Sequence, residues 1–110
     1  MTEEKPKTTL TDGKPVSPDH REIDPATGMQ KGYVVLSDAE RAKGFVRPVR
    51  RTYIHKKCGT ATIMGQAIAE TYAREPSFYG GTFCAQCRDH FPVGPKGEFV
   101  WAGTKEKVGT

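Results

Sequence analysis

The sequence predicts a small α+β domain of the zinc-ribbon or treble-clef type, with short β-strands, one main helix and a disordered N-terminal tail. Two short motifs have metal-ligand spacing, His55-Lys56-Lys57-Cys58 and Cys84-Ala85-Gln86-Cys87. A chain of 110 residues builds one small core, which is marginal without a further staple. The 12 glycines and 8 prolines favour turns over long regular elements.

Residues 1–30 are expected to form a flexible tail, and residues 31–110 the zinc-binding domain. The first segment contains four prolines and few large apolar side chains, so it buries too little surface to offset its ordering entropy. Within it, the run Asp24-Pro25-Ala26-Thr27-Gly28 is a turn signal, where we expect local docking.

A short strand is predicted at Tyr33–Leu36 from its aromatic and β-branched content. The next residues have the capping-box pattern of a short helix, with Ser37 at the cap and Glu40 three residues later. Gly44 is a natural stop for that helix.

The run from Phe45 to Ile54 is rich in Val, Ile, Thr and Tyr, which favours a strand. Pro48 within it indicates an edge strand or a break. The main helix is predicted over Thr62–Glu75, where apolar residues recur at helical spacing until Pro76 ends the pattern. Further short strands are expected at Tyr79–Phe83 and Glu98–Trp101, the second preceded by a turn at Gly94–Gly97.

Metal ligation accounts for all three cysteines, whereas any disulfide scheme would leave one unpaired. Two residues between ligands allow a tight turn to aim both side chains at one point, and Gly59 permits the left-handed backbone of such a knuckle. The alternative is a redox Cys-x-x-Cys dithiol, but its usual βαβ context is missing. The sequence therefore predicts one structural Zn²⁺.

The fourth ligand has two candidates beside Cys58, Cys84 and Cys87. His55 pairs with Cys58 to make two symmetric knuckles, and we favour it for that reason. His90 follows Cys87 by three residues and completes an equally legitimate Cys3His set. If His55 binds the metal, His90 is expected to be a neighbouring or solvent-facing residue.

A basic strip precedes and enters the first knuckle. Residues 1–30 are about 2 negative, so the remaining chain carries +6 against the overall +4. Lysines and arginines beside an aromatic ring are a recurrent nucleic-acid surface, and the same charges also suit an acidic host protein or a solvated edge strand. The candidate contact residues are Arg47, Arg50, Arg51, Tyr53, Lys56 and Lys57.

Four protein ligands close a zinc site and leave no position for a catalytic water. The sequence therefore predicts a non-enzymatic binding module. The adjacent Asp89 and His90 are faintly similar to a metal-dependent nuclease motif, but the downstream Asn and His of that motif are absent. A third alternative is a structural or accessory protein that docks to a protein assembly through aromatic side chains between Phe78 and Trp101.

No stretch approaches the roughly 20 apolar residues that span a bilayer, and the first residues lack the apolar run of a signal peptide. We therefore expect no membrane partner and a cytoplasmic location, where thiols stay reduced. The sequence does not indicate an oligomeric state.

Several segments resemble a family of small, largely uncharacterised phage and prophage proteins with an HxxC…CxxC zinc-knuckle core. The resemblance covers nearly the whole chain and is carried by Gly44–Arg51, His55, Cys58-Gly59, Ala69–Arg74, Phe78–Cys84, Cys87, His90 and Phe99–Trp101. It implies a phage-encoded protein of the host cytoplasm with a zinc-knuckle core, and it implies no particular activity.

Overall fold

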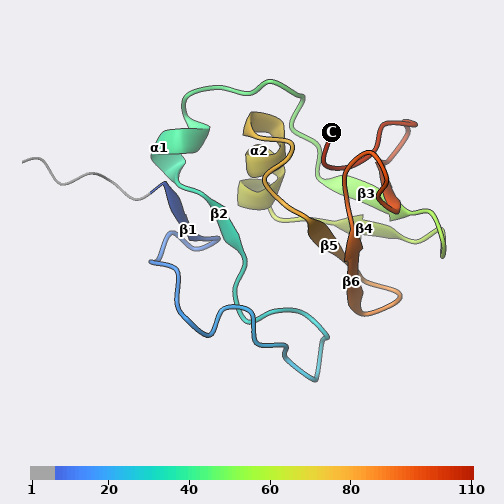
Figure 1. Cartoon of the computed structure of the whole chain (residues 1–110), viewed down its shortest axis with the longest axis horizontal. Helices are drawn as coiled ribbons and strands as arrows, with labels where there is room; N and C mark the ends of the chain where they lie inside the picture. The colour runs from blue at the N-terminus through green and yellow to red at the C-terminus, as the bar shows by residue number, and fades with distance from the viewer. Residues whose placement is uncertain (1–6) are drawn as a thin grey trace, which may run out of the picture.

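The computed structural model describes residues 7–110 and has a small α+β architecture with one main helix (Figure 1). The elements in this range are β1 (Thr8–Leu10), β2 (Val34–Leu36), α1 (Asp38–Arg41), β3 (Thr52–His55), β4 (Ala61–Ile63), α2 (Gln66–Arg74), β5 (Gly81–Cys84), β6 (Asp89–Pro92) and β7 (Phe99–Trp101). The predicted small α+β class, with short strands and one main helix, is thus confirmed. Neither helix in residues 7–110 is long and apolar enough to cross a membrane.

The strands form three small antiparallel sheets, ordered β1-β2, β4-β3-β7 and β5-β6. Two of the pairs are hairpins. In β3-β4, Tyr53 lies opposite Thr62, and in β5-β6, Phe83 lies opposite His90. The turn of each hairpin contains one of the Cys-bearing knuckles, so the two knuckles belong to different sheets.

The core lies between α2 and the three-stranded sheet, on whose inner face Tyr53 and Trp101 are 2% and 3% exposed. Tyr72 of α2 packs edge-on against Trp101, with ring centroids 5.6 Å apart. On its other side α2 contacts β2, where the hydroxyl of Thr71 accepts a hydrogen bond from the backbone N–H of Leu36. The helix therefore joins the N-terminal sheet to the sheet that carries the first knuckle (Figure 1).

The predicted strand at Tyr33–Leu36 and the short capped helix after it are both confirmed, as β2 and α1. The Ser37 hydroxyl accepts a hydrogen bond from the backbone N–H of Glu40, as the capping-box pattern requires. Gly44 follows with φ +110°, a left-handed conformation that suits a helix stop.

The predicted strand over Phe45–Ile54 forms only from Thr52 onward, and the break indicated by Pro48 is confirmed. Only β3 forms, and it is the central strand of its sheet rather than an edge strand. Before Pro48 the backbone turns away, since the N–H groups of Val46 and Arg47 both donate to the carbonyl oxygen of Ala73. These two donors are therefore used to hold the segment against the end of α2.

The main helix was predicted to start at Thr62, and this start is wrong. Residues 61–63 pair with β3 as strand β4, and α2 starts after Gly65, which occupies the cap position with extended backbone. Tertiary pairing overrides the helical periodicity here, because β3 offers a complete ladder of backbone partners. The predicted end before Pro76 is confirmed.

Residues 1–6 of the predicted tail lie outside the described residues. The remainder of the segment contains β1, which pairs with β2, and an isolated bridge between Ile23 and Gln30. The predicted docking of the turn at residues 24–28 is confirmed, because the guanidinium of Arg88 donates hydrogen bonds to the carbonyls of Ala26 and Thr27. Backbone pairing thus orders a segment that has few large apolar side chains.

Candidate metal centre

Four side chains from the two hairpins converge at one point. The Nδ1 atom of His55 and the Sγ atoms of Cys58, Cys84 and Cys87 all lie within 4.8 Å of one another. His55 ends β3 and Cys84 ends β5, while Cys58 and Cys87 lie in the turns that follow these strands. These four residues are the set favoured from the spacing in the sequence, and together they could hold a metal ion.

The two knuckles have the same backbone construction. The residue after the second ligand is left-handed in both, with φ +73° at Gly59 and φ +55° at Arg88. Each of these residues donates its backbone N–H to the carbonyl of the first ligand, Gly59 to His55 over 2.7 Å and Arg88 to Cys84 over 2.8 Å. A left-handed arginine costs roughly 1–2 kcal/mol, so the second turn is held by its surroundings rather than by local preference.

Three of the distances between these atoms are close to those around a tetrahedral ion. Nδ1 of His55 lies 3.4 Å from Sγ of Cys58 and 3.6 Å from Sγ of Cys87, and the Sγ atoms of Cys58 and Cys84 are 3.5 Å apart. Zn–S and Zn–N bonds in a regular tetrahedron place N and S about 3.6 Å apart and two S atoms about 3.8 Å apart. All three cysteines are free thiols.

The ring of His55 is fixed on three sides. It is 1% exposed and packs against both Phe91 and Phe99, whose ring centroids lie 4.5 Å and 4.7 Å from its own. Its Nε2 atom lies 2.9 Å from a carboxylate oxygen of Glu98, which also contacts the ammonium of Lys57 at 3.3 Å. A carboxylate that accepts the Nε2 proton leaves Nδ1 with a lone pair facing the thiols, the tautomer that binds a metal.

The thiols have opposite acidities. Hydrogen bonding from the backbone of Thr60 lowers the pKa of Cys58 to about 6. Desolvation raises the pKa of Cys87 to about 11, and the neighbouring thiols of Cys84 and Cys58 raise it further. One thiolate in the group therefore opposes ionisation of the others, and a divalent cation is the charge that would stabilise all three thiolates together.

His90 is not part of this group. It lies opposite Phe83 in the β5-β6 ladder, and alternation puts that pair on the other face of the hairpin from Cys84. Its Nε2 atom is 2.8 Å from the hydroxyl of Tyr33, and its ring packs edge-on against Phe83. Burial lowers the pKa of His90, with Asp89 opposing. The expectation of a merely solvent-facing histidine is wrong.

Only some side chains of the basic strip are exposed to solvent. Arg47, Arg51, Lys56 and Lys57 are exposed. Arg50 is half-buried, because it pairs with Glu106 at 2.8 Å and its guanidinium lies 4.8 Å from the centroid of the Trp101 ring.

Tyr53 does not belong to the exposed strip, and its expected role as a stacking ring is wrong. The side chain is 2% exposed and its hydroxyl donates a hydrogen bond to the carbonyl of Phe83. Strand alternation points it toward the core together with His55. Burial raises its pKa, as expected for a tyrosine inside the protein.

Glu98 and Phe91 hold His55 in place, and Glu98 was not identified from the sequence. Glu98 is 43 residues from His55 in the chain, and the strand pairing of β3 with β7 brings them together. The only local indication of this contact was the predicted strand Glu98–Trp101, and the sequence did not indicate which strand it would pair with. Asp89 accepts a hydrogen bond from the backbone N–H of His90, and neither residue joins a metal-ligating group within residues 7–110.

No protein-family model matches this chain, and comparison with curated proteins and with solved structures found no match either.

Proposed function

We propose that His55, Cys58, Cys84 and Cys87 bind one structural Zn²⁺, in a zinc-ribbon-like pair of knuckles. Three thiolates and one imidazole are the donors that zinc prefers in structural sites. The tetrahedral distances between the ligand atoms support this choice. The ion would join two hairpins of separate sheets, and four protein ligands would leave it no open position for substrate.

Elemental analysis of purified protein tests the metal and its ligands. We expect one zinc per chain in the wild type and in His90→Ala, and a loss of zinc in His55→Ala. Zinc retained by His55→Ala but lost from His90→Ala would contradict the ligand set. If the protein as purified contained no zinc and had a disulfide between Cys84 and Cys87, the zinc site itself would be contradicted.

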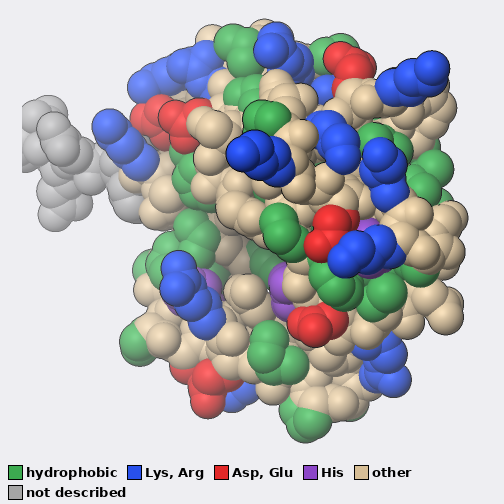
Figure 2. Space-filling view, turned by 45° about the vertical axis from the view of Figure 1, so that its right-hand side comes forward, with side chains coloured by type: hydrophobic (Ala, Val, Ile, Leu, Met, Phe, Trp, Pro, Cys, Tyr) green, Lys and Arg blue, Asp and Glu red, His purple; other side chains and the backbone are tan. Residues whose placement is uncertain are grey.

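We propose further that the chain is a non-enzymatic binding module whose basic strip contacts nucleic-acid phosphates. The supporting observation is that Lys56 and Lys57 are exposed at the tip of the hairpin whose turn carries Cys58. Residues 47–57 contain no acidic side chain. Figure 2 shows Lys and Arg side chains over the upper and right-hand parts of one face, with a few acidic groups among them.

With Tyr53 buried, contacts to phosphates rather than base stacking would supply the affinity. Such contacts release counterions, so affinity is expected to fall steeply with salt and to depend little on sequence. A phage-encoded protein acting in the host cytoplasm, as the resemblance implies, would meet nucleic acid there.

Binding of random single- and double-stranded DNA and RNA across a salt series tests this proposal. Replacing Arg47 and Lys56 by Gln should flatten the slope of log K against log salt by about 2, one for each phosphate contact. The control carries Lys14→Gln and Lys43→Gln, which remove the same charge elsewhere. No binding at low salt, or equal slopes for both variants, would contradict the proposal and leave an acidic host protein as the partner to test.

Docking to a protein assembly is the second candidate, and the predicted aromatic patch does not carry it. No side chain in that group, from Phe78 to Trp101, is among the exposed large hydrophobics. Phe45 and Val46 are, at 46% and 58% exposure, on the segment that is fixed to Ala73. Phe45→Ser would weaken such docking and leave nucleic-acid binding unchanged.

The metal-dependent nuclease stays a prediction, tested by incubating nucleic acid with the protein and Mg²⁺ or Mn²⁺.

A further inference from the structure

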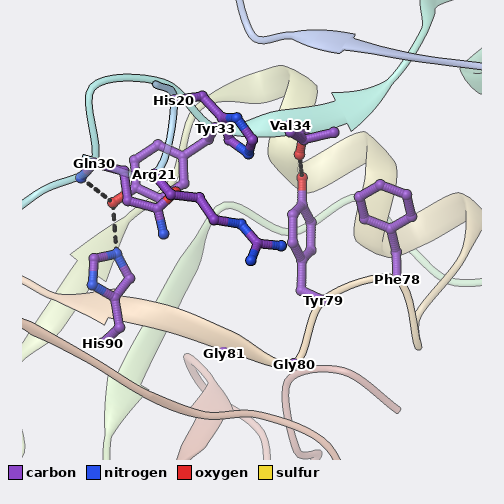
Figure 3. A pocket seen from close by; sticks show the side chains of 10 residues that line it. All are labelled: His20, Arg21, Gln30, Tyr33, Val34, Phe78, Tyr79, Gly80, Gly81 and His90. Carbon is purple, nitrogen blue, oxygen red and sulfur yellow. Dashed lines mark hydrogen bonds between the residues drawn. The ribbon is translucent and has the colours of Figure 1, made fainter. Parts of the chain in front are cut away.

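A pocket of about 480 Å³ lies on the other side of the β5-β6 hairpin from Cys84. One wall comes from the N-terminal segment, with His20, Arg21 and Tyr33, and the other from the approach to β5 and from His90 on β6 (Figure 3). The space-filling view is hollowed near its middle, where histidine side chains are visible (Figure 2). The volume is in the range of small-molecule sites.

The lining suits an anion, because its one charged side chain is the exposed Arg21. The ten residues that line the pocket include one arginine and two histidines and no acidic residue. Arg21 makes no ion pair and no side-chain hydrogen bond with any residue from 7 to 110, and Figure 3 shows its guanidinium reaching into the pocket toward Tyr79. An unpaired guanidinium facing a cavity is a bidentate donor for a carboxylate or phosphate.

Polar groups near Arg21 are already oriented. Nδ1 of His20 donates a hydrogen bond to the carbonyl of Ser17 at 2.7 Å, and Nε2 has no partner among residues 7–110. The Tyr33 hydroxyl accepts a hydrogen bond from the backbone N–H of Gln30 at 3.2 Å, so its own proton is directed to Nε2 of His90 at 2.8 Å. The pocket thus has a fixed polar wall opposite its aromatic one.

The remaining lining is aromatic and rigid. The rings of Phe78 and Tyr79 meet edge-to-face with centroids 4.8 Å apart, and the Tyr79 hydroxyl donates to the carbonyl of Val34 at 2.6 Å. Fixed rings of this kind favour a flat apolar body packed against them. An inorganic phosphate ion would leave most of the volume and all of this apolar lining without contacts.

We propose that this pocket binds a small aromatic anion, a planar ring that carries a phosphate or a carboxylate. Arg21 holds the anionic group, and Phe78 and Tyr79 contact the ring. None of its lining residues is a proposed metal ligand or a member of the basic strip, so the inference goes beyond the function proposed above.

Titration of ¹⁵N-labelled full-length protein tests the site with four probes. AMP and 1-naphthoate carry both parts of the expected ligand, whereas adenosine and inorganic phosphate each carry one. We expect saturable shifts at Arg21, Tyr33 and Gly80 with AMP or naphthoate, and at least tenfold weaker binding of the half-ligands. Saturation by AMP alone identifies a phosphate head group, and saturation by naphthoate alone a carboxylate. Saturation by neither, or by inorganic phosphate as tightly as by AMP, would overturn the proposal.

Two variants that each remove one positive charge locate the binding. Arg21→Gln should weaken the better probe at least tenfold, and it should fold normally because Arg21 has no partner to lose among the described residues. Lys43→Gln removes an exposed charge outside both the pocket and the basic strip and should bind the probe as the wild type does. Equal affinity of Arg21→Gln and wild type would refute the site. Arg21→Gln should also keep the salt-dependent nucleic-acid binding, which separates this test from that of the basic strip.

Discussion

The carboxylate of Glu98 contacts Nε2 of His55 and so orients the ring toward the three thiols. Replacing Glu98 therefore tests a residue that would affect metal binding without contacting the ion. Glu98→Ala leaves the Nε2 proton of His55 without an acceptor and frees the ring to change tautomer. Loss of such a carboxylate typically weakens metal affinity 10- to 100-fold. Competition with a chromophoric chelator measures the change.

Glu98→Gln should weaken metal affinity less than Glu98→Ala, since the amide oxygen of Gln still accepts a hydrogen bond from the Nε2–H of His55. Glu106→Gln is the matched control, because Glu106 pairs with Arg50. If Glu98→Ala held zinc as tightly as the control, the hydrogen bond to His55 would have no part in metal binding.

At the residue scale, the convergence of the four His and Cys residues could be predicted because its information is local. The two-residue spacings put His55 with Cys58 and Cys84 with Cys87. The choice of His55 over His90 also followed from spacing, and the structure adds the reason in strand alternation. Glu98 could not be predicted, because its contact with His55 depends on how β7 aligns with β3, which no local pattern specifies.

At the scale of elements, Gly28 joins the N-terminal turn to the second knuckle. Its φ is +79°, and a Cβ there would lie 2.5 Å from the carbonyl oxygen of Arg88. Gly28→Ala should therefore destabilise the fold by more than the backbone strain alone, which is roughly 1 kcal/mol. Urea unfolding of the zinc-bound protein measures the loss.

Gly13→Ala is the matched control, because Gly13 has φ +86° and nothing within 4 Å of its Cβ position. Gly13→Ala therefore introduces the backbone strain of a positive φ without a steric clash of the new Cβ atom. Equal losses in the two variants would mean that the turn does not dock on Arg88 in solution.

A second prediction concerns the junction of the two helices. Arg41 of α1 contacts Glu70 of α2 at 2.6 Å, with side-chain exposures of 14% and 23%. Hydrogen bonds from Gln66 and Arg41 lower the pKa of Glu70. A double-mutant cycle with Arg41→Met and Glu70→Gln at pH 7 should give a coupling energy of about 1 kcal/mol, near the upper limit for pairs that water still reaches. A coupling of zero would mean that α1 and α2 are held by packing alone.

The helices and strands that could be predicted depend on residues close in sequence, whereas those that were missed depend on pairing with distant strands. The capping box of α1 and the end of α2 before Pro76 depend on neighbouring residues, and both were predicted from the sequence. The end of strand β4 was mistaken for the first turn of a helix, because the helical period of the following residues extends back to Met64 and only the pairing with β3 decides. Strand β1 was missed for the same reason, since its partner β2 is more than twenty residues away.

At the scale of the whole molecule, the metal should decide whether the chain folds. A core this small is marginal, and a structural zinc contributes on the order of 10 kcal/mol to folding. Removing zinc with a strong chelator under reducing conditions should therefore collapse the amide dispersion in NMR spectra and lower the unfolding temperature. Stoichiometric Zn²⁺ should restore both.

Mg²⁺ should not restore the fold, because it prefers oxygen ligands. A metal-free chain with an unchanged, dispersed spectrum would show that the core around Tyr53, Tyr72 and Trp101 is sufficient on its own.

The position of the two knuckles on separate hairpins has a consequence for chain length. Binding one ion at both knuckles closes a loop from Cys58 to Cys84 that contains β4 and α2. The entropy lost on closing a loop grows only with the logarithm of its length, about 0.6 kcal/mol for each doubling. Insertions between the knuckles are therefore cheap, whereas one extra residue inside a knuckle would misdirect a ligand. Proteins that share this centre should keep both two-residue spacings and vary freely in the distance between them.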